Sequence, residues 1–233
     1  MRSSGQRRAV VTGSSSGIGR AIAQALLAEG WHVTGFDIAP ASIAHDRFTS
    51  TRVDLCDPTS VEAAAATLGP VAALVHAAGV LRVGPLGKLQ VPDGELMWRL
   101  HVESIARIAN VVLPAMAVSR DGRVVLIGSR VAEGKAGRSQ YAATKAALIA
   151  LARSWAAEVI GAGVTVNVVS PAATETAMLD DPARKSESPV LPPLGRLIRP
   201  EEIAALVVFL LSPSAGAITG QNIQICGGAS LPH

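Results

Sequence analysis

A strand, a glycine-rich turn and a helix follow one another at the start of this sequence. Residues 8–12 form a short apolar run rich in β-branched side chains, and residues 20–29 have the pattern of a helix. Between them stand Gly13, Gly17 and Gly19, in the spacing Gly-x-x-x-Gly-x-Gly. Glycines let a backbone approach a pyrophosphate closely, and a helix N-terminus offers it free amides. The segment therefore predicts a phosphate-binding turn, although the bare spacing also fits an ordinary tight turn.

Strand and helix patterns then alternate to the end of the chain. Further strands are expected at residues 32–36, 49–53, 71–75, 123–127, 164–169 and 222–225. The expected helices cover residues 58–68, residues 92–119 with an interruption at Pro114, a stretch that carries Tyr141 and runs to residue 160, and residues 200–211. This alternation without a linker predicts a single α/β domain over residues 1–233, a doubly wound parallel sheet flanked by helices.

The carboxyl ends of the expected strands carry candidates for a dinucleotide site, because such sheets bind ligands there. Asp37 stands about twenty residues beyond the glycine turn, where a carboxylate accepts hydrogen bonds from ribose hydroxyls and repels a 2′-phosphate. A helix cap is the alternative role for this residue. Asp54 is placed to accept from the adenine amino group. No arginine or lysine lies within residues 14–16 or directly after Asp37, so we favour NAD over NADP.

Tyr141 and Lys145 stand four residues apart, and therefore one turn apart on one face of a helix. A tyrosine with a pKa of ~10 is a poor proton relay at neutral pH, and lowering that pKa by ~3 units requires ~4 kcal/mol of phenolate stabilisation. A lysine cation can supply part of it. The spacing alone also fits a solvated helix face, but Tyr141 is the only tyrosine in the chain.

Composition argues against several classes of partner. The net charge is +3 with scattered basic residues, and aromatic residues make up only 3%, so we expect no nucleic-acid partner. Cys56 and Cys226 lack metal-ligand spacing, which predicts two thiols and no metal site. The apolar run at residues 204–211 is too short to span a membrane, and the N-terminus lacks a signal-peptide core. We therefore expect a soluble, cytoplasmic protein without a membrane partner.

Together these residues resemble the short-chain dehydrogenase/reductase family over nearly the whole chain. The shared landmarks are Thr12 with the glycine turn, Asp37, Asp54, Ala77-Ala78-Gly79, Ser129, Tyr141 with Lys145, Asn167 with Pro171, and Thr176. The resemblance implies a Rossmann-type fold in which Tyr141 is the acid/base, Lys145 binds the nicotinamide ribose and lowers the tyrosine pKa, and Ser129 orients the substrate oxygen. The cofactor-binding residues that it implies are Gly13, Ser15, Ser16, Gly17, Ile18, Gly19, Asp37, Asp54, Leu55, Ala77, Ala78, Gly79, Tyr141, Lys145, Pro171, Thr174 and Thr176.

Two histidines depart from the family pattern, which usually has asparagine at both positions. Where His101 stands, the family's asparagine is a fourth catalytic residue whose backbone carbonyl holds a water of the proton relay. A histidine keeps that carbonyl, so we expect activity and count His101 as catalytic. For His76 we expect a packed or hydrogen-bonded side chain at a strand end. The resemblance also implies a homotetramer, with helices 92–119 and 141–160 buried between subunits.

We therefore expect an NAD(H)-dependent oxidoreductase that interconverts a secondary alcohol and a carbonyl. The loop after Ser129 carries Arg130, Glu133, Lys135 and Arg138, and the flap at residues 178–199 has little apolar surface for an acyl chain. With a closer likeness to 2,3-dihydro-2,3-dihydroxybenzoate dehydrogenases, this predicts a small cyclic hydroxy acid or diol as the small-molecule substrate. The alternatives are solvated loop charges, a 3-oxoacyl-type carbonyl reductase, and a non-catalytic protein that senses NADH.

Overall fold

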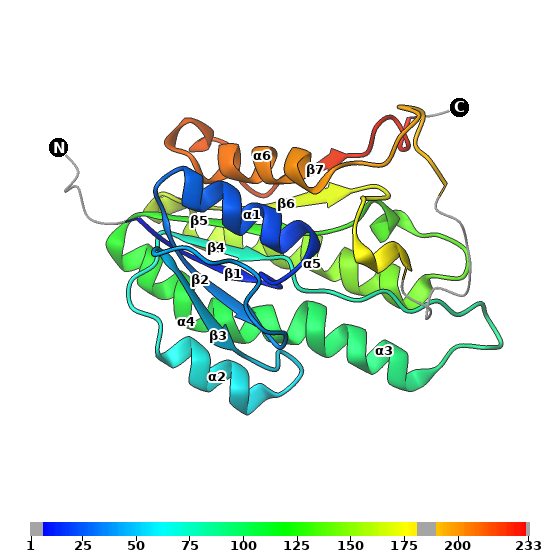
Figure 1. Ribbon diagram of the computed structural model, residues 1–233, viewed down its shortest axis with the longest axis horizontal. Coiled ribbons are helices and arrows are strands. Elements are labelled where there is room, and N and C mark those ends of the chain that lie inside the picture. Colours follow the sequence, from blue (N-terminus) through cyan, green and yellow to red (C-terminus); the bar gives the residue numbers. More distant parts are fainter. Residues whose placement is uncertain (1–6, 181–189, 232–233) are drawn as a thin grey trace.

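One parallel sheet organises the computed structural model, which describes residues 7–180 and 190–231 (Figure 1). Its seven strands are β1 (Arg8–Thr12), β2 (His32–Asp37), β3 (Phe48–Arg52), β4 (Ala73–His76), β5 (Gly122–Ile127), β6 (Val164–Pro171) and β7 (Asn222–Ile225). They lie in the order β3-β2-β1-β4-β5-β6-β7, and every neighbouring pair is parallel. The predicted doubly wound, Rossmann-type parallel sheet is confirmed.

Helices cover both faces of this sheet. They are α1 (Gly17–Ala28), α2 (Pro58–Ala66), α3 (Val91–Trp98), α4 (Ser104–Ser119), α5 (Ser139–Val159) and α6 (Pro200–Leu211). Figure 1 shows α1 and α6 on one face, with α2 and α4 on the other. The helix α5 packs with α4 against that second face, where buried side chains from α2, α4 and α5 share one core cluster.

The strand order creates a crevice beside β1. The chain first winds from β1 outward to β2 and β3, and then returns to place β4 on the opposite side of β1. The connections on either side of this switch point leave the sheet in opposite directions, which opens a ligand-binding crevice at the carboxyl ends of the strands. The loops after β1 and β4, which carry the glycine turn and the Ala77-Ala78-Gly79 segment, therefore face each other there.

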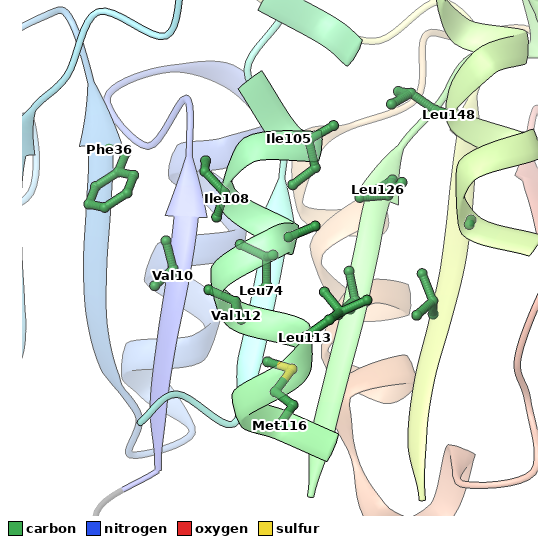
Figure 2. Close-up of a cluster of buried hydrophobic side chains, with 14 of the residues drawn as sticks. Val10, Phe36, Leu74, Ile105, Ile108, Val112, Leu113, Met116, Leu126 and Leu148 are labelled. Carbon is green, nitrogen blue, oxygen red and sulfur yellow. The ribbon is translucent and has the colours of Figure 1, made fainter. Parts of the chain in front are cut away.

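The core consists of strand side chains that are covered on both faces of the sheet. Every residue of β4, β5 and β6 is buried, as expected for central parallel strands. Figure 2 shows α4 in front of β4, between β1 and β5. Its labelled side chains that meet strand residues are Ile105, Ile108, Val112, Leu113 and Met116, opposite Val10, Phe36 and Leu74. This packing holds α4, and the segment before it, firmly against the sheet.

The long helical pattern at residues 92–119 is interrupted at a different place from the one predicted. The helix α4 runs through Pro114, whereas a π-helical turn, η1 (Arg99–Glu103), separates α3 from α4. Pro114 and Asn110 are exposed, so water can reach the carbonyl that the proline cannot pair, and the helix continues. The predicted interruption at Pro114 is therefore wrong, and the irregular turn contains His101.

The same stretch has an apolar composition that the sequence analysis overlooked. Val91–Ser119 is long enough to cross a membrane, and an 18-residue window within it has a mean hydropathy of 1.3, so it passes by length and composition alone. In this fold its second half covers the sheet, with Ile105, Ile108 and Met116 among the most deeply buried side chains. Its apolar composition thus matches that of a core helix.

Candidate active site

A cavity of about 1020 Å³ occupies the crevice at the carboxyl ends of the strands. Most of the residues predicted for the site line it together: Gly13, Ser16, Gly17, Ile18, Gly19, Asp37, Asp54, Leu55, Ala77, Ala78, Gly79, Ser129, Tyr141, Lys145, Pro171, Thr174 and Thr176. Ser15 and His101 are the predicted residues outside this lining. The volume suits a dinucleotide together with a small ligand.

The glycine turn between β1 and α1 brings the backbone close to the cavity. Gly13 has a φ of 69°, and a Cβ on it would lie 2.8 Å from the Ala78 backbone. A Cβ on Gly19 would lie 2.1 Å from the Gly13 carbonyl oxygen. The helix α1 begins at Gly17, earlier than predicted, and its N-cap Ser16 makes no side-chain capping bond. The first-turn amides are therefore available to an anion such as a pyrophosphate.

Thr12 ties this turn to the segment after β4. Its Oγ1 accepts hydrogen bonds from the amides of Ala77 and Ala78, both at 3.2 Å, and lies 2.8 Å from His76 Nδ1. Since both amides can only donate, the Thr12 hydroxyl donates its proton to Nδ1. Burial, followed by the Lys145 charge, lowers the pKa of His76 to about 3. His76 is therefore neutral, and its hydrogen bond to Thr12 confirms the packed or hydrogen-bonded side chain expected at this strand end, whereas the role of Thr12 was not anticipated.

The end of the cavity lined by Asp37 and Asp54 is acidic and apolar. The Asp37 carboxylate accepts from the amides of Ser15 and Ala39, each at 2.9 Å, and every carboxylate oxygen keeps a second acceptor position. The Ser15 amide thus holds the Asp37 carboxylate in place by a hydrogen bond. The described residues at this end are Asp37, Ile38, Val53, Asp54, Leu55 and Cys56, none of them basic. The lining at this end suits ribose hydroxyls and includes no cation, although Arg52 is the strand partner of Asp37 and Arg99 acts electrostatically on Cys56.

At the opposite end, β5 and α5 bring the predicted catalytic residues together. Ser129 follows β5 and accepts a hydrogen bond from the Val131 amide at 3.2 Å. Tyr141 and Lys145 lie in the first turns of α5 and are 9% and 5% exposed. Lys145 Nζ donates to the Ile127 carbonyl at 2.9 Å and lies 5.8 Å from the Tyr141 ring centroid. A hydroxyl, a phenol and an amine from three buried residues therefore line the same cavity.

Burial dominates the electrostatics of Lys145. It lowers the pKa of the amine from 10.5 to about 7, so the protonated and neutral forms are both populated at neutral pH. An anion or a set of acceptor oxygens in the cavity would favour the protonated form. Among residues 7–180 and 190–231, no group of three or more His, Cys, Asp or Glu side chains could hold a metal ion.

His101 lies behind this part of the cavity, in the π-helical turn η1. Its Nε2 is 3.0 Å from the Val80 amide, and its Nδ1 is 2.8 Å from Thr144 Oγ1. The imidazole meets the Tyr141 ring edge-on, with centroids 5.7 Å apart. Burial, and then the Lys145 charge, lower the pKa of His101 well below its usual value. The side chain does not line the cavity, and the role of its backbone carbonyl stays a prediction.

The outer wall of the cavity combines apolar surface with cations. Its apolar side chains include Val80, Leu81, Val131, Met178, Leu179, Val190, Leu191, Pro192 and Pro193. The expectation that the flap at residues 178–199 offers little apolar surface is therefore wrong, while its residues 181–189 lie outside the described residues. Arg130, Lys135 and Arg138 line the same part of the cavity, and Arg138 is only 9% exposed. The acid Glu133 is not among the lining residues and accepts a hydrogen bond from Gln224.

Comparisons with known proteins agree with this geometry. Residues 13–230 match the family model described as enoyl-(acyl carrier protein) reductase. The 3-oxoacyl-[acyl-carrier-protein] reductase FabG of Vibrio cholerae serotype O1 is 37% identical, over 94% of this chain and 96% of that protein. Oxidoreductase UcpA of Escherichia coli O157:H7 is 33% identical, over 97% and 95%. The ligand-free aldohexose dehydrogenase of Thermoplasma acidophilum superposes with a TM-score of 0.90 at 26% identity, covering 98% of this chain and 95% of its own.

Proposed function

This chain belongs to the short-chain dehydrogenase/reductase family, and on that premise we propose that it is an NAD(H)-dependent oxidoreductase that interconverts a secondary alcohol and a carbonyl. Enzymes of this family use a nicotinamide cofactor. The observation that carries the proposal is the meeting of Ser129, Tyr141 and Lys145 in one cavity with the glycine turn. Their roles in the reaction follow from the chemistry of the three side chains.

The cofactor would accept a hydride from the alcohol carbon or return one to the carbonyl carbon. In the oxidative direction the Tyr141 phenolate takes the hydroxyl proton, and in the reductive direction the phenol gives it back. The Ser129 hydroxyl donates a hydrogen bond to the substrate oxygen. The protonated Lys145 amine stabilises the phenolate and binds the nicotinamide ribose. Because these groups are buried, each of these charge interactions is stronger than it would be in water.

A panel of secondary alcohols, assayed for NADH formation, tests this proposal against a non-catalytic NADH sensor. The sensor alternative is motivated by His101, which stands where the family has a catalytic asparagine. A sensor would have no need of a hydroxyl, a phenol and an amine in one corner. We expect turnover with part of the panel. Tight NADH binding without turnover of any member would favour the sensor.

Asp37 supports NAD as the cofactor. Its carboxylate lies at the proposed ribose-binding end, where the cavity lining includes no cation, so a 2′-phosphate would meet like charge. Arg52, the strand partner of Asp37 on β3, does not line the cavity. We expect kcat/KM with NAD to exceed that with NADP by at least tenfold, or ~1.4 kcal/mol. Measuring both values on one enzyme preparation tests the choice, and equal values would defeat it.

We propose a small cyclic hydroxy acid as the substrate. The apolar wall suits the ring, and an arginine beside it can hold a carboxylate in a bidentate grip. The test compares a carboxylated cyclic alcohol with its methyl ester on wild type, Arg130→Ala and Arg138→Ala, with Arg153→Ala on the exposed side of α5 as the control. The acid should be preferred, and at least one site variant should raise its KM. If the ester reacts equally well, or neither variant changes KM, the idea fails.

A 3-oxoacyl-type carbonyl substrate is the second candidate. The cavity wall has more apolar surface than the sequence predicted, and the FabG relative is named for that reaction. Adding a 3-oxoacyl thioester to the reductive assay distinguishes the two substrate classes. Faster reduction of the thioester than of the cyclic oxo acid would favour this candidate.

We further propose a cytoplasmic homotetramer without nucleic-acid or membrane partners. Trp98 and Val111, on the stretch that the family likeness buries between subunits, are 49% and 42% exposed in the single chain. Subunit contacts there would remove this apolar surface from water. Light scattering during size-exclusion chromatography should give the mass of four chains, and a monomer at micromolar concentration would contradict the proposal.

A further inference from the structure

His101 connects two separate parts of the active site. Its Nε2 lies 3.0 Å from the amide of Val80, in the loop that follows β4, and its Nδ1 lies 2.8 Å from Thr144 Oγ1, on α5. The Thr144 hydroxyl lies 2.9 Å from the backbone carbonyl oxygen of Tyr141. The imidazole is fully buried, so these contacts are shielded from water.

The directions of these hydrogen bonds are fixed. The Val80 amide can only donate, so His101 Nε2 accepts, and in the neutral ring the proton is then on Nδ1. That proton is donated to Thr144 Oγ1, whose own proton is donated to the Tyr141 carbonyl. Burial, and then the Lys145 charge, lower the pKa of His101 and keep the ring neutral, and His76, which is also neutral, faces it as well. An unbroken chain of directed bonds therefore runs from the loop after β4 to the residue that carries the phenol.

Both ends of this chain lie at the cavity. Val80 and Tyr141 line it, whereas His101 and Thr144 do not. A Cβ on Gly79 would lie 3.1 Å from His101 Nε2 and 3.6 Å from Lys145 Nζ, so the loop rests directly on the imidazole. The ring also packs against the Tyr141 ring in a T-shaped arrangement. Moving His101 would therefore move the loop and the phenol relative to each other.

We propose that His101 is a positioning residue that fixes the Gly79-Val80 loop and the Tyr141 phenol in one common geometry. It acts through the Val80 amide and the Thr144 hydroxyl, and touches neither cofactor nor substrate. The bond to the Val80 amide, the loop half of this role, concerns cofactor binding. The bond through Thr144 to Tyr141, the α5 half, concerns proton transfer. The second half rests on the proposed oxidoreductase function, while the first does not.

Four variants separate the two halves. In His101→Gln, the amide oxygen can take the place of Nε2 and accept from Val80, whereas no donor remains at the position of Nδ1, which faces Thr144. Thr144→Val keeps the shape of the side chain and removes the hydroxyl, leaving the Val80 bond intact. His101→Ala removes both links, and Thr144→Ser is the control that keeps the hydroxyl. If His101→Ala does not fold, His101→Gln and Thr144→Val still carry the test.

The measurements are the Kd for NADH by fluorescence titration and kcat with a substrate that the wild type turns over. For His101→Ala we expect a Kd about tenfold higher, equivalent to 1.4 kcal/mol, and a lower kcat. For His101→Gln and Thr144→Val we expect a Kd within about twofold of wild type and a kcat about fivefold lower, as for the loss of one buried hydrogen bond. Thr144→Ser should match wild type in both quantities.

An unchanged Kd in His101→Ala would overturn the loop half. An unchanged kcat in both His101→Gln and Thr144→Val, or equal losses in Thr144→Ser and Thr144→Val, would overturn the α5 half. These failures are distinct from failure of the proposed function. If the wild type turns over no alcohol or carbonyl, the Kd for NADH should still rise in His101→Ala alone.

Discussion

Replacing Lys145 by methionine should stabilise the fold at low pH while removing the amine from the active site. The side chain is 5% exposed, and its one recorded hydrogen bond is donated to the Ile127 carbonyl. Methionine fills a similar volume without a charge. The variant therefore removes the desolvation cost that lowers the lysine pKa, and it leaves the carbonyl without this partner.

The lowering of the Lys145 pKa from 10.5 to about 7 sets the magnitude and the sign of the expected change in the free energy of unfolding. Between these two values the unfolded chain binds a proton that the folded chain has lost, so the stability of the wild type rises with pH. Below the folded pKa both states are protonated, and the full cost of up to ~5 kcal/mol is present. Leaving the Ile127 carbonyl unpaired costs ~1–3 kcal/mol. The net gain for Lys145→Met at pH 6 is therefore ~2–4 kcal/mol. It falls to zero near pH ~9 and becomes a loss of ~1–3 kcal/mol above pH ~10.5, where only the unpaired carbonyl counts.

Thermal unfolding at pH 6 and pH 9 measures this difference. For a chain of this size we expect the Tm of Lys145→Met to exceed that of wild type by about 2–4 °C per kcal/mol at pH 6, with a smaller difference at pH 9. Lys88→Met, at an exposed position, is the control and should shift neither Tm. The reasoning is refuted if the gain is equal at the two pH values or absent at pH 6.

Three further substitutions test the supports of the cofactor site. Gly19→Ala should abolish NADH binding because its Cβ would collide with the Gly13 carbonyl. The control Gly30→Ala, with a φ of 83° in open space, should cost only ~1–2 kcal/mol of stability and keep NADH binding. Titration with NADH compares the two variants, and NADH binding by Gly19→Ala would contradict the turn geometry. Thr12→Val removes the hydroxyl that bonds to His76, Ala77 and Ala78, so it should lower the free energy of unfolding by ~2–4 kcal/mol and weaken NADH binding. An unchanged urea midpoint would contradict this role of the Thr12 hydroxyl. Asn167→Ala removes bonds to Ile218 and Gln221 below the site, so it should cost ~2–4 kcal/mol in urea unfolding with NADH affinity unchanged, and weaker NADH binding would contradict this separation.

Most of the fold could be predicted because buried parallel strands read as short apolar runs. The observed strands begin and end within about two residues of the predicted ones. The π-helical turn Arg99–Glu103 could not be predicted, because its residues fit the surrounding helical pattern. Pro114 misled for the opposite reason: a proline that normally breaks a helix is tolerated where its free carbonyl faces water.

The candidate site could be predicted where a backbone constraint or a charge at a strand end left a local signal. The glycine turn and Asp37 are such cases. The hydrogen bonds of the Thr12 hydroxyl could not be predicted, because they join residues 64 to 66 positions apart. The bond between His101 and Thr144 could not be predicted either, because it joins residues 43 positions apart. The apolar cavity wall was missed because its side chains come from several loops that only the fold brings together.

The most direct test of the central claim is the turnover of Tyr141→Phe beside its affinity for NADH. The substitution removes only the hydroxyl that exchanges the substrate proton and keeps the ring that packs against His101. The account predicts a loss of at least ~100-fold in kcat, within the range that general acid–base catalysis contributes, with the Kd for NADH within about twofold of wild type. A variant that keeps more than about a twentieth of wild-type turnover would contradict the role of Tyr141 as the acid/base.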